Sequence, residues 1–123
     1  MPVAGAVATG LLAALHGYIT VLEMFMWTNV KANGKNAFGL SKDFAMKTSV
    51  LAANQGLYNG LLGAGLAWAA AHPNPEFARQ LRLFFVGCVC VAGSYGGYSS
   101  SRKLFMVQGL PAFISFAAVY LNL

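Results

Sequence analysis

Long apolar runs separated by short polar connections dominate the chain. The runs cover residues 3–29, 44–71, 77–99 and 104–122, and none alternates polar and apolar positions as a half-buried strand does. A helix of about 20 residues crosses the hydrocarbon core of a bilayer, and each run is about that long or longer. Backbone groups in lipid must pair within the segment, which favours helices. The pattern predicts one all-α domain over residues 1–123, a transmembrane four-helix bundle.

The connections carry residues that start or interrupt helices. Ser41 is a candidate N-cap, and Asn74 followed by Pro75 is typical of another helix start. Gly109 and Pro111 interrupt the last run, where we expect a kink. Because short connections join antiparallel neighbours, the predicted order is up-down-up-down.

Composition supports a membrane environment. Hydrophobic residues make up 58% of the chain and charged residues 9%, with a mean hydropathy of +0.60. Soluble domains carry about 25% charged residues. The net charge of +5 comes from scattered cations that form no basic face, so nucleic acid is not an expected partner. The first run lacks the basic region that precedes a cleavable signal, so we expect it to be retained as a helix.

The cations are distributed unequally between the connections. Six lie in or beside the first and third connections and two follow the second: Lys31, Lys35, Lys42, Lys47, Arg102 and Lys103 against Arg79 and Arg82. The positive-inside rule places the richer side in the cytoplasm. Both termini are therefore expected on the non-cytoplasmic side.

The first helix carries a polar stripe. Four residues fall within a sector of about 60° of the helix circumference: His16, Thr20, Glu23 and Trp27. A carboxylate at the centre of a membrane helix costs about 2.5–3.5 kcal/mol, so Glu23 is expected to face a pocket with a partner, either His16 or Lys47. The alternative is that Glu23 lies near the cytoplasmic boundary and reaches headgroup water.

The second helix has two contrasting faces. Its polar sector consists of Asn54, Gln55, Tyr58 and Asn59, and its small-residue face of Gly56, Gly60 and Gly63. The polar sector indicates either a pocket or ordinary hydrogen bonds between helices. The GxxxG spacing lets another backbone approach closely. This helix is therefore expected either to lie centrally in the bundle or to contact another chain, in a homo-oligomer or a membrane complex.

The later helices add fewer candidates. Gln108 could complete the pocket wall, and Gly93 with Gly97 favours close helix packing. Cys88 and Cys90 point to nearly opposite sides of a helix, so we expect small buried hydrophobes. With two histidines and no nucleotide-binding motif, the sequence predicts no metal site and no cofactor.

Three functions remain open at this point. The first is a pocket that binds, or acts on, a hydrophobic small molecule or lipid, with Glu23 and His16 as candidate acid and base. The remaining candidate binding residues are Thr20, Trp27, Asn54, Gln55, Tyr58, Asn59 and Gln108. The second is an accessory or structural subunit of a larger membrane complex. The third is a small proton-coupled transporter working as an oligomer. Whether the protein is an enzyme stays open.

Several strings resemble one family. They include Leu15-His16-Gly17-Tyr18, Leu51-Ala52-Ala53-Asn54-Gln55-Gly56-Leu57-Tyr58-Asn59-Gly60 and Val107-Gln108-Gly109-Leu110-Pro111-Ala112. Over nearly its whole length the chain is similar to the small four-helix membrane proteins catalogued as domain of unknown function 1304. That resemblance implies a multi-pass helical membrane protein and supplies no reaction or catalytic residues. A likeness to the trimeric four-helix membrane proteins of eicosanoid and glutathione metabolism concerns architecture alone.

Overall fold

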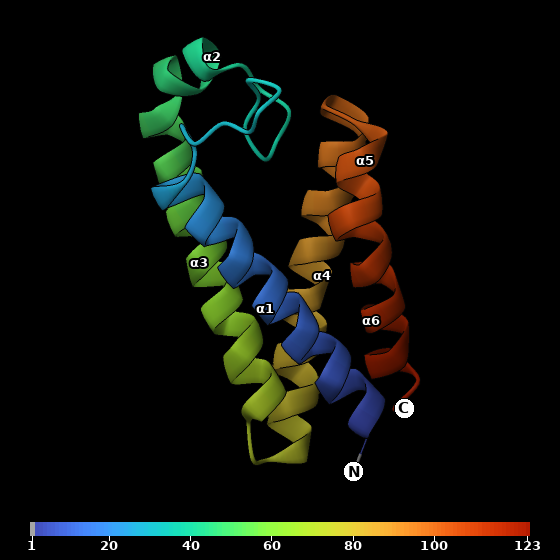
Figure 1. Cartoon of the computed structure of the whole chain (residues 1–123). Coiled ribbons are helices and arrows are strands. Elements are labelled where there is room, and N and C mark those ends of the chain that lie inside the picture. The colour runs from blue at the N-terminus through green and yellow to red at the C-terminus, as the bar shows by residue number, and fades with distance from the viewer. Residues whose placement is uncertain (1) are drawn as a thin grey trace. The chain divides into compact units, whose positions relative to one another are not determined.

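The computed structural model describes residues 2–123, which form helices joined by loops, with no strand (Figure 1). The elements are α1 (Val3–Phe25), α2 (Lys42–Lys47), α3 (Ser49–Ala71), α4 (Pro75–Ser99), α5 (Arg102–Leu104), the π-helical η1 (Phe105–Gly109) and α6 (Leu110–Tyr120). The predicted all-α class is confirmed over this range. The chain forms two compact units: unit 2 is Leu15–Gly63, and unit 1 combines the chain up to Ala14 with Ala64–Leu123.

Three helices are long and apolar enough to cross a membrane: α1, α4 and the continuous segment Arg102–Tyr120. Their lengths are 23, 25 and 19 residues. Helix α3 also has 23 residues but is not among the three, because amides and glycines dilute its apolar content. The described helices therefore suggest an integral membrane protein.

In unit 2, the first helix ends earlier than predicted. Helix α1 stops at Phe25, and the expected continuation to residue 29 is wrong. The backbone carbonyl of Trp27 instead accepts a hydrogen bond of 2.9 Å from Nδ2 of Asn36 in the following loop. That side chain also accepts from the backbone N–H groups of Phe38 and Leu40, at 2.9 and 3.0 Å. Asn36 thus organises the loop after α1 through local turns, a common role of Asn.

The second predicted run, 44–71, is two helices. Ser41 caps α2 as expected, accepting from the backbone N–H of Phe44 at 3.3 Å. The chain leaves the helical conformation at Thr48, which has φ −110° and ψ 9°. The Thr48 hydroxyl donates to the carbonyl of Phe44 at 2.8 Å and accepts from Nε1 of Trp27 at 3.0 Å. Hydroxyl bonding of this kind competes with regular helix geometry, which explains the break.

Unit 1 contains α4 and the last helix side by side (Figure 1). The predicted start of α4 is confirmed, since Oδ1 of Asn74 accepts from the backbone N–H groups of Glu76 and Phe77 at 3.0 and 3.1 Å. A Cβ on Gly93 would lie 2.5 Å from Cα of Gly109. The two backbones therefore touch, and the predicted close packing at Gly93 is confirmed.

The last helix is irregular next to the predicted interruption at Gly109 and Pro111. The irregularity is a π-helical turn, η1. Pro111 has no backbone N–H and its ring crowds the carbonyl four residues earlier. The backbone N–H of Leu110 bonds to the carbonyl of Phe105, five residues before it. This wider turn accommodates the proline and ends at Gly109, whose backbone contacts Gly93 of α4.

Two arginines of α4 bind the carboxyl ends of other helices in unit 1. Arg82, which is 8% exposed, donates from Nε to the carbonyl of Ala69 and from Nη2 to that of Ala70, at 2.9 and 2.8 Å. Arg79 donates from Nη2 to the carbonyl of Tyr120 at 3.1 Å, and its guanidinium lies 5.9 Å from the centre of that ring. Each cation thus satisfies carbonyls that a helix end leaves unpaired.

Candidate functional site

A polar contact joins α1 and α3 inside unit 2. Nδ2 of Asn59 donates to Oε1 of Glu23 over 2.6 Å, and both side chains are partly buried. Glu23 lies two residues before the end of α1, while Asn59 lies about 15 Å along α3 from its first residue. The structure thus brings together one predicted catalytic candidate and one predicted binding residue.

Two glycines allow this close approach. A Cβ on Gly56 would lie 2.6 Å from Cγ of Met24 and 3.0 Å from Cβ of Glu23. A Cβ on Gly60 would lie 3.2 Å from Cγ2 of Thr20. The prediction that Gly56 and Gly60 present a face to another chain is corrected here, because α1 of the same chain occupies that face. Gly63 is buried as well.

The other predicted partners of Glu23 are placed as follows. Lys47 pairs with Asp43 at 3.1 Å, and both side chains are exposed, so the alternative in which Lys47 is the partner of Glu23 is wrong. His16 is buried, with 1% of its surface exposed. It lies two turns before Glu23 on α1, about 10 Å along the helix axis. The hydroxyl of Thr20 donates to the backbone carbonyl of His16 at 2.8 Å, so Thr20 contributes packing against Gly60.

Trp27 lies at the loop end of unit 2. Its ring is 5.1 Å from that of Phe38, and its backbone and indole are held by Asn36 and Thr48. Asn36, which is only 2% exposed, was not among the predicted site residues. Its position in a loop rich in Asn, Gly and Lys was the available signal, since Asn in such loops often bonds the backbone nearby.

The remaining polar residues of α3 point outward. Asn54 and Gln55 are exposed, and Tyr58 is 68% exposed. Nδ2 of Asn54 donates to the carbonyl of Val50 in its own helix, at 2.9 Å. Of the four polar side chains predicted on this helix, Asn59 is therefore the one that contacts Glu23.

Gln108 belongs to unit 1, within η1, and is partly exposed. Its predicted place in a pocket wall with the α3 residues therefore stays a prediction. Two cavities lie among residues of unit 1, one near the start of α4 and the other along the apolar face that includes Phe84, Cys88 and Val91. Among residues 2–123, no three His, Cys, Asp or Glu side chains gather as metal ligands would.

Comparison with known proteins identifies the family of this chain. A family model described as a protein of unknown function (DUF1304) matches residues 10–120. The uncharacterized protein YpaA of Lactococcus lactis subsp. lactis (strain IL1403) is 35% identical over 94 residues, which are 75% of this chain and 76% of the relative. No solved structure matches. The family match spans every predicted site residue, from His16 to Gln108, and the chain belongs to the DUF1304 family.

Proposed function

We propose that this protein is an integral membrane protein whose Glu23–Asn59 contact binds the polar end of an amphipathic small molecule or lipid. The observation that carries the proposal is the 2.6 Å hydrogen bond between the Glu23 carboxylate and the Asn59 amide. An ionisable residue within a membrane helix is rare and commonly marks a functional site. Here that residue has a defined partner on a second long helix.

The balance of donors and acceptors supports a ligand. An ionised carboxylate has about four acceptor positions on two oxygens, and Asn59 supplies one donor to one oxygen. The hydroxyl of Thr20 is already committed to the carbonyl of His16. A hydroxyl, amine or amide at the polar end of an apolar molecule would supply a further donor. This chemistry fits binding, because a proton passing between His16 and Glu23 would have to cover about 10 Å along the helix.

Replacing Glu23 by glutamine is expected to reduce occupancy of the bound molecule about tenfold. Glutamine keeps the shape and still accepts from Asn59. It loses the charge, however, and a hydrogen bond to a charged group contributes about 1.5–3 kcal/mol against about 0.5–1.5 kcal/mol for a neutral pair. Native mass spectrometry of the protein, purified in mild detergent, measures the adduct directly. The matched control is Asp43→Asn, which makes the same carboxylate-to-amide change on the exposed α2.

The two variants separate the possible outcomes. A molecule retained by wild type and Asp43→Asn, and lost from Glu23→Gln, supports the proposal. Equal retention by all three proteins, or a wild type without an adduct, contradicts it. Thermal unfolding of each variant shows whether the fold is intact.

A second candidate function is self-association, in which this chain is a structural subunit of a homo-oligomer. The observation in its favour is the exposure of Asn54, Gln55 and Tyr58 on one helix. Amides carry donors and acceptors in equal measure, so a second copy of the same helix offers matching groups. The mass spectra described above also give the number of chains per particle. A monomer throughout would remove this candidate.

We propose further that four helices cross the membrane in an up-down-up-down order with both termini on the non-cytoplasmic side. Support comes from the short connections and from the six cations in or beside the first and third of them. In this arrangement α3 also crosses the membrane, in addition to the three more apolar helices, despite its lower hydropathy.

This topology predicts opposite labelling at two exposed positions. After Cys88 and Cys90 are replaced by alanine, a membrane-impermeant maleimide applied to intact bacterial cells is expected to label Leu123→Cys and to spare Lys35→Cys until the cells are lysed. Lys35 lies in the loop after α1, and Leu123 follows α6. Labelling of both positions from the same side would refute the proposed order.

A further inference from the structure

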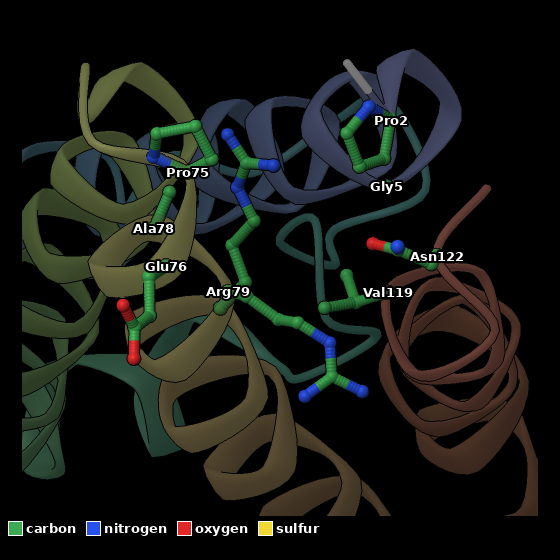
Figure 2. A pocket seen from close by; sticks show the side chains of 9 residues that line it. Pro2, Gly5, Pro75, Glu76, Ala78, Arg79, Val119 and Asn122 are labelled. Carbon is green, nitrogen blue, oxygen red and sulfur yellow. The ribbon is translucent and has the colours of Figure 1, made fainter.

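A cavity of about 250 Å³ lies in unit 1 where α4 begins and α6 ends (Figure 2). Its lining consists of Pro2, Gly5, Pro75, Glu76, Ala78, Arg79, Arg82, Val119 and Asn122. Typical small-molecule pockets measure about 300–1,000 Å³. The smaller volume is suited to one polar group and the chain atoms next to it.

Two guanidinium groups line this cavity and are held in place by backbone carbonyls. Nε and Nη2 of Arg82 bind the end of α3, and Nη2 of Arg79 binds the end of α6. A guanidinium carries five N–H donors, so each arginine has donors beyond those used here. The helix ends thus orient two cations beside the same space without exhausting their bonding capacity.

The positive charge around the cavity is not neutralised by ion pairs within the described chain. Within residues 2–123, an ion pair joins Asp43 to Lys47. Neither Arg79 nor Arg82 forms an ion pair with a carboxylate in this range. The lining includes one carboxylate, that of Glu76, which Figure 2 shows across the pocket from Val119 and Asn122. The amino ends of α1 and α4 place the positive ends of two helix dipoles at the cavity, and the carboxyl end of α6 places one negative end there. Two cations against one anion leave a net attraction for an external anion.

The position of the cavity identifies the source of that anion. The lining comes from the start of α1, the start of α4 and the end of α6, which are ends of the three helices long and apolar enough to cross a membrane. Ends of membrane-spanning helices lie at the level of lipid headgroups. Five of the nine lining residues have no polar side chain, among them Pro2, Ala78 and Val119, and they can pack against the carbon atoms of a lipid next to its phosphate.

We infer that this cavity binds a phosphate group, and that the phosphate belongs to the headgroup of an anionic phospholipid. Guanidinium groups bind phosphate through paired, charge-assisted hydrogen bonds, which is why arginine is common at such sites. This site is separate from the Glu23–Asn59 contact and does not depend on the function proposed for it.

The first test uses the wild-type protein. Protein exchanged into mixed micelles with equal amounts of phosphatidylglycerol and phosphatidylcholine is examined by native mass spectrometry. We expect preferential retention of phosphatidylglycerol that survives millimolar inorganic phosphate. Equal retention of the two lipids overturns the inference, and displacement by inorganic phosphate alone overturns the lipid as the source of the phosphate.

The second test changes one of the two arginines. Arg79→Gln is expected to lower retention of phosphatidylglycerol about tenfold, since it removes a charge and its hydrogen bonds to the phosphate. Arg102→Gln, the same change at an exposed residue at the start of α5, serves as the matched control. Arg79→Lys keeps the charge without the planar fork and should fall between wild type and Arg79→Gln. A glutamine variant that retains as much lipid as the control contradicts the assignment.

The two proposals can fail independently. Glu23→Gln should leave phosphatidylglycerol retention unchanged, and Arg79→Gln should leave the Glu23-dependent adduct unchanged. A single variant that abolishes both adducts would show that the two sites are not separate and would overturn this inference.

Discussion

The Gly93→Ala variant is expected to lose about 1–3 kcal/mol or more of unfolding free energy. A Cβ at this position would lie 2.5 Å from Cα and 2.6 Å from the backbone nitrogen of Gly109. Both neighbours are backbone atoms, so no side-chain rotation relieves the overlap, and α4 must move away from η1. Packing between membrane helices depends on such close approach, which makes this contact sensitive to one methyl group.

Thermal unfolding in detergent micelles measures the effect, with Gly17→Ala as the matched control. A Cβ on Gly17 meets nothing within 4 Å, and this residue also lies within a helix. Alanine is favoured over glycine by about 0.5–1 kcal/mol in helices, so the control should unfold at the same temperature or higher. Equal unfolding temperatures for the two alanine variants would show that α4 and η1 do not touch.

Replacing Arg82 by methionine is expected to destabilise the protein by about 3 kcal/mol. Methionine keeps the apolar stem but removes both hydrogen bonds to the carbonyls of Ala69 and Ala70. These carbonyls belong to the last turn of α3 and would lose the cation that favours a helix carboxyl end.

The same unfolding measurement distinguishes this role from a general effect of losing charge. Arg102→Met removes an exposed arginine and should change stability by less than about 0.5 kcal/mol. Arg82→Lys retains the charge but not the two-pronged geometry, and is expected to fall between wild type and Arg82→Met. If Arg82→Met unfolds at the temperature of Arg102→Met, Arg82 does not stabilise the end of α3.

Features that depend on neighbouring residues were predictable from the sequence. The helix starts at Ser41 and Asn74 and the irregular turn before Pro111 follow from local backbone chemistry. The break at Thr48 was not predictable in this way, because it involves the indole of Trp27, 21 residues earlier. An apolar run shows that a helix will form but not where a distant donor will interrupt it.

The candidate site was also predictable only where local sequence determines it. The stripe on α1 identified Glu23, since a carboxylate in an apolar helix stands out by its energetic cost. Its partner Asn59 lies 36 residues away and was one of four polar side chains on α3, which spacing alone could not rank. In the sequence, Arg82 indicated only the orientation of the helices in the membrane. Its contact with α3 arises when α4 folds back after the turn at residues 72–74.

The hydrogen bond between Trp27 and Thr48 also provides a spectroscopic probe. The chain has two tryptophans, and they fall in different units: Trp27 in unit 2 and Trp68 in unit 1. The indole of Trp27 is partly buried and hydrogen-bonded, whereas Trp68 is 57% exposed. Their fluorescence therefore comes from two distinct surroundings. Single-tryptophan proteins would report the opening of each unit separately, without an attached dye.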